Sequence, residues 1–321
     1  MDDATDATDA TDATDATHRG STGHGHTSND DTHDTHNTHD TATGAAGAAG
    51  ATGAAGATGA IGERTSELTR RLLAPNPGPM TLDGTNSYII RAPNAETCVV
   101  VDPGPLHEGH LKLLASGAPV ELVLITHHHS DHTEASARFA AITGAQVRAL
   151  DPAFCVDGAP LVDNEEIVAG GTRIRVLATP GHSSDSVCFV LPDDGPTGSV
   201  LTGDTILGRG TTIIAHPDGN LAEYLHSLEL LAGIGDAVAL PAHGDSLENL
   251  MAACERYRAH RLARLAEVRD VVATLGPDAT VEKVTDLVYA DTDPAIRFAA
   301  EASMRAQLEY LESEAAGSAP A

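Results

Sequence analysis

The amino-acid sequence predicts an α/β fold of four layers, a helix–sheet–sheet–helix (α/β/β/α) sandwich, followed by a small helical domain. Three observations support this prediction. Short β-branched runs alternate with amphipathic helical stretches from residue 63 to residue 254. Helical spacing then dominates residues 255–321. Aromatic residues make up 3% of the chain and Trp is absent, so the core must consist of Ala, Val, Leu and Ile, which suit close packing of helices on sheets.

Residues 1–62 are predicted to form a disordered low-complexity tail. They contain Asp-Ala-Thr repeats, a segment rich in His, Thr and Asp, and a Gly/Ala/Thr segment. Large aliphatic and aromatic side chains are missing before Ile61, so burial cannot offset the entropy lost on ordering. We interpret the tail as a solvated leader. The alternative is loose metal binding by its six histidines, which are His18, His24, His26, His33, His36 and His39.

The elements of the sandwich follow in order along the chain. A turn at Pro93-Asn94 separates the first two strands, and the strand that ends at residue 126 runs directly into a histidine cluster. The predicted strands are residues 87–91, 98–102, 122–126, 146–149, 173–179, 186–191, 199–202 and 237–240, and the predicted helices are 106–116, 134–142 and 221–231.

Three further helices are predicted after the last strand, over residues 247–275, 280–289 and 294–311. Gly276-Pro277 ends the first of them, because proline cannot continue a helix. Asp293 is the expected N-cap of the last helix, with Pro294 at its first position.

Charge and cysteine usage limit the class of protein. The chain carries 46 acidic and 19 basic residues, a net charge of −27, which disfavours a large phosphate-binding surface. Its four cysteines form no Cys-x-x-Cys pair, so neither a disulfide framework nor a structural zinc site is expected. We find no signal-peptide pattern and no apolar stretch of about 20 residues. These features predict a cytoplasmic protein with no membrane partner.

The sequence Thr-His-His-His-Ser-Asp-His at residues 126–132 is the main chemical motif. His127 and His129 are two residues apart, so on extended backbone their side chains can face the same way. Asp131 and His132 follow on the turn and can reach a second point nearby. Imidazole and carboxylate groups are suitable ligands for zinc, and also for manganese or iron. The motif therefore predicts metal binding.

Three more residues of ligand type, His182, Asp204 and His243, each follow a predicted strand. A glycine beside each of them allows the backbone to turn sharply and approach a metal closely. Ligands at several strand ends can meet at one edge of a sheet. His128 is expected to point away from the metals and to have a structural role. The remaining histidines of the folded region are interpreted as surface residues, and these are His107, His110, His216, His226 and His260.

These motifs resemble the metallo-β-lactamase superfamily, whose signature His-x-His-x-Asp-His is present at residues 127–132. The resemblance implies a metallo-β-lactamase sandwich and a site for two divalent ions, zinc first, with manganese or iron as alternatives. It implies that a hydroxide between the ions is the nucleophile, and that Asp131 is a catalytic residue that orients it. The implied ligands are His127, His129 and His182 for the first metal, Asp131, His132 and His243 for the second, and Asp204 as the bridge between them.

The segments at residues 83–88, 102–104 and 203–212 further resemble the beta-lactamase-like protein 2 family. This resemblance covers roughly residues 75–314, and it implies a catalytic domain at 63–254 and a winged-helix-like domain at 255–321. The sequence departs from the thioesterase relatives in one place, where Glu134-Ala135 replaces the Gly-Gly that commonly follows their motif.

The resemblance leaves several functions open. The first is hydrolysis of a small-molecule ester or thioester, as the thioesterase relatives imply. The alternative is cleavage of single-stranded RNA, because mitochondrial members of the beta-lactamase-like protein 2 family are similar to single-strand endoribonucleases. β-Lactam hydrolysis and a non-catalytic scaffold are weaker alternatives. Residues 63–321 carry 36 acidic and 18 basic side chains, whereas a nuclease would need a basic channel. Such a channel could use a cluster of arginines that we interpret instead as a solvated helix face, namely Arg256, Arg258, Arg261 and Arg264.

The last predicted helix carries several glutamates, which disfavours nucleic-acid binding by the helical domain. We therefore expect this domain to shape the substrate cleft or to form the contact of a homodimer. The glutamates are Glu301, Glu309, Glu312 and Glu314.

Overall fold

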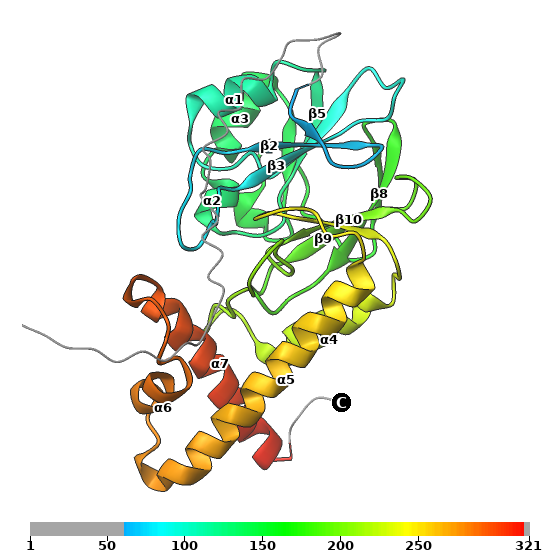
Figure 1. Cartoon of the computed structure of the whole chain (residues 1–321). Coiled ribbons are helices and arrows are strands. Elements are labelled where there is room, and N and C mark those ends of the chain that lie inside the picture. Colours follow the sequence, from blue (N-terminus) through cyan, green and yellow to red (C-terminus); the bar gives the residue numbers. More distant parts are fainter. Residues whose placement is uncertain (1–60, 318–321) are drawn as a thin grey trace, which may run out of the picture. The chain divides into compact units, whose positions relative to one another are not determined.

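Two β-sheets form the centre of the computed structural model, which describes residues 61–317 (Figure 1). The predicted tail and its six histidines lie outside the described residues, except for positions 61 and 62. The first sheet has the strand order β1-β2-β3-β4-β5-β6, with β1 Glu63–Arg64, β2 Thr69–Leu73, β3 Asn86–Ile90, β4 Cys98–Val101, β5 Val120–Leu124 and β6 Gln146–Arg148. The second has the order β11-β10-β9-β8-β7, with β7 Glu166–Ala169, β8 Thr172–Ala178, β9 Val187–Leu191, β10 Ser199–Gly203 and β11 Val238–Pro241.

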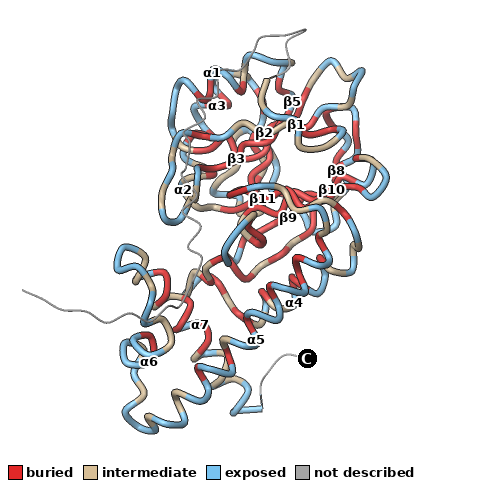
Figure 2. The backbone as a smooth tube through the Cα atoms, viewed as in Figure 1, coloured by how far each residue is buried: buried red, intermediate tan, exposed pale blue. Residues whose placement is uncertain are grey.

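The alternation of side chains along each strand separates the core into layers. Tyr88 and Ile90 of β3 belong to a cluster that also contains Phe189 of β9, so this cluster fills the space between the sheets. Ile89, between Tyr88 and Ile90, packs instead in a cluster with Leu111, on the outer face of the first sheet. Figure 2 shows that buried residues concentrate in these strands.

Helices cover the outer face of each sheet. Helices α1 (Glu108–Leu114) and α3 (Ser136–Thr143) pack on the first sheet through one apolar cluster. Helix α4 (Leu221–Ala232) and the beginning of α5 (Leu250–Leu275) pack on the second through another (Figure 1). The predicted four-layer sandwich is therefore confirmed.

Helices also make up the C-terminal region, as predicted. Val268 of α5, Val284 of α6 (Val281–Val288) and Met304 of α7 (Arg297–Ala315) form a small core of their own. No strand is present among residues 242–317, and the comparison with a winged helix remains a prediction. Helix α5 runs without a break through residues 254 and 255, the predicted domain boundary, which also remains a prediction. None of the helices in the described part is long and apolar enough to cross a membrane.

Capping side chains define where the C-terminal helices begin. The side chain of Asp293 accepts a hydrogen bond from the backbone N–H of Ala295, as the predicted N-cap should. The segment it caps is a short 3-10 helix, Pro294–Ile296, and α7 begins only at Arg297. The single helix predicted from residue 294 is therefore divided into two elements.

Candidate metal centre

The structure brings all seven predicted ligand residues together in two neighbouring groups. Within each group the donor atoms lie within 4.8 Å of one another. Oδ1 of Asp204 lies 3.3 Å from Nε2 of His243 and 3.7 Å from Nε2 of His132, two members of the other group, and its role as a bridge between two metals remains a prediction. The first group is His127, His129, His182 and Asp204, and the second is Asp131, His132 and His243.

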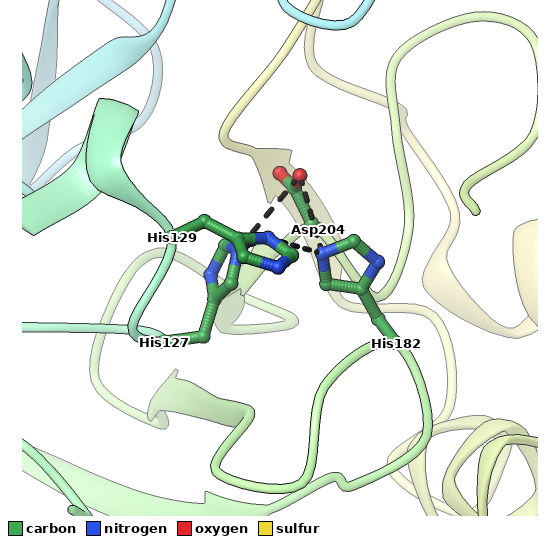
Figure 3. A group of neighbouring side chains, drawn as sticks. All are labelled: His127, His129, His182 and Asp204. Carbon is green, nitrogen blue, oxygen red and sulfur yellow. Dashed lines mark hydrogen bonds and ion pairs between the residues drawn. The ribbon is translucent and has the colours of Figure 1, made fainter. Parts of the chain in front are cut away.

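The first group consists of three imidazole nitrogens that converge on one carboxylate (Figure 3). Nδ1 of His129 lies 2.9 Å from Nε2 of His127 and 3.0 Å from Nε2 of His182. Oδ2 of Asp204 lies 3.6 Å from Nε2 of His182. Burial lowers the pKa of His129 to about 4 and that of His127 well below its ordinary value, and it also lowers the pKa of His182. The three rings are therefore neutral near pH 7, which is the state in which histidine binds a metal.

The second group pairs Asp131 with two buried histidines. Oδ2 of Asp131 lies 3.2 Å from Nε2 of both His132 and His243. Nε2 of His132 and Oδ1 of Asp204 are nonetheless buried without a hydrogen-bond partner among the described residues. Buried polar atoms of this kind normally have a partner. A divalent cation would satisfy both atoms at once, so the donor set fits the divalent metals that the resemblance implies.

The carboxylates of the second group and its surroundings raise the pKa of both of its histidines. Burial opposes protonation of His132, but the carboxylates of Asp131 and Asp102 outweigh it and hold the pKa of His132 well above its ordinary value. Burial likewise opposes protonation of His243, and Asp204 and Asp131 raise its pKa to about 10. A cation bound here would have to displace these protons.

The ring nitrogens that face away from the donor groups are held by fixed partners. Nδ1 of His132 lies 2.9 Å from Oδ2 of Asp102, Nδ1 of His182 lies 2.7 Å from the carbonyl oxygen of Ile213, and Nδ1 of His243 lies 3.1 Å from that of Gly84. Each partner is an acceptor, so one ring proton is on Nδ1, and Nε2 is the atom that faces the site. His129 has the opposite orientation, with its Nδ1 facing the site.

Asp102 and Thr85 support the site and were not predicted as functional residues. The carboxylate of Asp102 accepts hydrogen bonds from the backbone N–H and the hydroxyl of Thr126, in addition to its contact with His132. Asp102 has a φ of +51°, a conformation that non-glycine residues adopt only when other contacts compensate. The Thr85 hydroxyl donates to Oδ2 of Asp131 over 2.9 Å. Both residues lie in segments, 83–88 and 102–104, that resemble the beta-lactamase-like protein 2 family. That resemblance was the sequence signal that could have identified them.

Two glycines next to predicted ligands pack closely against neighbouring parts of the chain, whereas the predicted approach to a metal remains a prediction. Gly203, before Asp204, has a φ of +51°, and a Cβ atom there would lie 2.8 Å from Cβ of Thr126. Gly181, before His182, has a φ of +134°, and a Cβ atom there would overlap the backbone of Tyr224. These positions have no room for a side chain.

The other histidines mostly lie where the sequence placed them. His128 contacts Asp185 through Nδ1 over 2.7 Å and belongs to neither donor group. The exception is His110, which was expected on the surface but is 3% exposed. It lies on the face of α1 that packs against the first sheet, where its Nε2 atom lies 2.9 Å from the hydroxyl of Ser87. The prediction for His110 was therefore wrong.

The interpretation of the arginine cluster as a solvated face is only partly correct. Arg256 and Arg258 are exposed, but Arg264 is half-buried and Arg261 is buried. The segment around Thr212 covers this side of α5, and Arg261 donates through Nη2 to the carbonyl of Thr212. Arg261 is therefore buried. Two of the four arginines therefore belong to the interior of the helical region.

Comparisons with known proteins agree with the geometry. The model of the metallo-beta-lactamase superfamily matches residues 80–243, about half of the chain. A beta-lactamase-like protein 2 homolog from Caenorhabditis elegans is 29% identical over 268 residues, 78% of this chain and 85% of that protein. An atrochrysone carboxyl ACP thioesterase from Aspergillus fumigatus is 34% identical over 189 residues, 56% of this chain and 57% of that protein.

A solved structure extends the comparison to the helical region. The crystal structure of a metallo-beta-lactamase family protein from Thermus thermophilus matches with a TM-score of 0.66 and 25% identity, over 77% of this chain and 94% of that one. Against several fungal lactamase-like proteins, by contrast, the match spans 59–66% of their length.

Proposed function

Since this chain belongs to the metallo-beta-lactamase superfamily, we propose that it is a hydrolase that uses two divalent metal ions, zinc first, to cleave a small ester or thioester. One observation carries the proposal: seven donor residues, which follow the ends of four strands (β5, β8, β10 and β11), converge in two adjoining groups. Such convergence is costly to a fold, because it buries several titratable groups, and it is typical of a functional site.

A cavity of 440 Å³ gives a substrate access to both groups. Its walls include His129 and Asp204 of the first group and Asp131 of the second. The rest of the lining is partly apolar, with Met80 and Phe298 among its side chains. A cavity of this size, with polar groups at one end and apolar side chains around them, suits a small acyl group.

The site residues have distinct roles in the proposed reaction. Divalent cations held by the two groups would supply an activated water molecule and polarise the carbonyl of the substrate. Asp131 presents its Oδ2 atom to His132 and His243, and its other oxygen is the group that would accept a proton from the attacking water. Thr85 keeps the Asp131 carboxylate in this orientation through the hydroxyl described above.

Two observations favour a small ester or thioester over a polymer. The folded region carries twice as many acidic as basic side chains, 36 against 18 in residues 63–321, which opposes binding of a long polyanion. A relative that is 34% identical over the matched residues is named as a thioesterase. The beta-lactamase-like protein 2 homolog, which matches 78% of this chain, supports single-stranded RNA as the second candidate through the resemblance noted in the sequence.

Hydrolysis assays on the full chain test the proposal. The protein is loaded with Zn²⁺ or Mn²⁺ and given acyl thioesters or single-stranded RNA. His182→Ala and Asp131→Ala should abolish turnover, whereas His226→Ala, on the exposed face of α4, should retain it. Thioester turnover that both site variants retain would overturn the proposal. RNA cleavage without thioester turnover would replace it with the second candidate.

A further inference from the structure

A second cavity, of 410 Å³, adjoins the metal centre on the side of the helical region. It shares Met80, Asp204 and Ile213 with the first cavity. Its walls come from the segment at residues 207–213, from α5, and from the chain between Tyr289 and Ser303. The C-terminal helices thus complete a chamber that begins at the donor groups.

Positive charge gathers in this chamber although the protein as a whole is acidic. The lining includes Arg261 and Arg264 of α5, as well as Arg209, which forms an ion pair with Asp83. Among the described residues of the lining, Asp204 provides the only carboxylate, and it belongs to the metal centre. The part of the chamber formed by α5 therefore presents cationic side chains in a chain of net charge −27.

Arg261 is the most informative of these residues. It is 4% exposed, and no carboxylate of a described residue lies within 4.0 Å of it as an ion-pair partner. Its Nη2 atom donates to the carbonyl of Thr212, its guanidinium carbon lies 5.3 Å from the ring centre of Tyr224, and its Nε atom has no hydrogen-bond partner among the described residues. Burying an unpaired guanidinium costs free energy that an anion beside it would offset.

Arg264 extends the positive surface by one helical turn. Its guanidinium carbon lies 4.8 Å from the ring centre of Tyr289, and Nη1 donates to the carbonyl of Val288 over 2.8 Å. Its carboxylate partner, Glu267, is 57% exposed, so solvent screens that pair. Burial first, and then the charges of Arg261 and Arg264, lower the pKa of His260, as expected beside two cations.

We propose that this chamber binds an anionic group of the substrate, a phosphate or a carboxylate, while the ester or thioester bond lies at the metal centre. The inference rests on the proposed function and deepens it by naming a substrate class, acyl thioesters that carry an anion on one side of the scissile bond. The guanidinium groups of Arg261 and Arg264 are suitable donors to such an oxyanion. The lining also offers the hydroxyls of Thr211 and Ser303.

Two matched pairs of substrates test on which side of the scissile bond the substrate carries its anion. The first pair is acetyl-4′-phosphopantetheine and acetyl-pantetheine, which differ only in a phosphate on the thiol side. The second pair is glutaryl-pantetheine and pentanoyl-pantetheine, which differ in a carboxylate on the acyl side. We expect the full, zinc-loaded chain to prefer the anionic member of one pair by at least about tenfold in kcat/KM, since one good charge-assisted interaction corresponds to that factor. The pair that shows the preference identifies the source of the anion.

Variants of the chamber assign the preference to its residues. In Arg264→Gln the ratio of kcat/KM for the anionic substrate to that for the uncharged one should fall toward one, because only the anionic substrate loses a charge-assisted contact. Arg258→Gln is the matched control, because Arg258 lies on the exposed side of the same helix and contacts Glu229. Arg261→Met should reduce the preference too, but Arg261 also supports Thr212 beside His182, so Arg264→Gln is the deciding variant.

Calorimetric binding of 4′-phosphopantetheine and of glutarate to the same proteins separates this inference from the proposed function. If Arg264→Gln binds one of these anions more weakly than the wild type and Arg258→Gln does not, the chamber is supported. If the protein also shows no thioester turnover, the proposed function is overturned while the chamber stands. Thioester turnover with no preference in either substrate pair would overturn the chamber and leave the proposed function standing.

Discussion

Nδ1 of His132 lies 2.9 Å from Oδ2 of Asp102, and both side chains are almost completely buried. The Asp102 carboxylate also binds the backbone N–H and the hydroxyl of Thr126, the residue before the ligand motif. One carboxylate therefore fixes the ring of a predicted ligand and the start of the segment that carries four predicted ligands.

Asp102→Asn tests this relationship. Loss of the charge should weaken zinc binding by about 10–100-fold, because an outer partner of a ligating histidine sets its orientation and basicity. Chelator competition measures the affinity. Asp185→Asn, which removes the corresponding partner of the non-ligand His128, is the control and should bind zinc as the wild type does. Equal affinity in Asp102→Asn and the wild type would show that Asp102 only supports the backbone.

Gly181→Ala tests the close packing beside His182. The added Cβ would overlap the backbone of Tyr224, so we expect a loss of about 3 kcal/mol or more in the free energy of unfolding. Gly235→Ala is a control with a positive φ of +94° and no atom within 4 Å of the added Cβ, and it should cost only about 1 kcal/mol. Urea denaturation measures both values. Similar losses would show that φ, and not the overlap, decides the cost.

His110→Gln tests a pH dependence of stability. Burial, with a smaller contribution from His107, lowers the pKa of His110 to about 4, below the ordinary 6.5. As the pH falls from 6.5 to about 4, the unfolded chain binds the proton first, so the folded wild type loses stability over this window. We expect His110→Gln to lose on the order of 1–3 kcal/mol less than the wild type between about pH 7 and about pH 4.

Urea denaturation across that pH range gives the comparison. His226→Gln, which changes an exposed histidine, should follow the wild type. If the free energies of all three proteins fall in parallel, His110 is protonated in the folded state like a surface histidine, and our account of its environment is wrong.

The sequence was sufficient to predict the sandwich and to single out seven side chains that the structure brings together, because both depend on local patterns. Their role as metal ligands remains a prediction. Buried strands such as β5 and β9 consist mainly of apolar residues such as Val and Leu, and the predicted ligands follow strand ends. Strands β1, β2 and β7 were missed because their patterns are weak. β1 has two residues, β2 contains Arg70 and Arg71, and in β7 the exposed position 168 is a valine, so polar and apolar residues do not alternate.

Features that depend on distant contacts could not be predicted. The role of Asp102 depends on its approach to His132, 30 residues away in sequence. Arg261 looked like part of a solvated helix face, and only the segment around Thr212 shows that it is buried. Helical spacing identifies a face but not the segment that will cover it.

Zinc titration of the chelator-treated full chain, with thioester hydrolysis followed in parallel, tests the central claim most directly. The proposed two-ion site predicts that His182→Ala binds fewer zinc ions than the wild type and loses turnover, whereas His226→Ala matches the wild type in both. The tail histidines are the same in all three proteins, so the difference isolates the donor groups. Full hydrolysis by the zinc-free wild type, or equal zinc binding by the wild type and His182→Ala, would contradict the account.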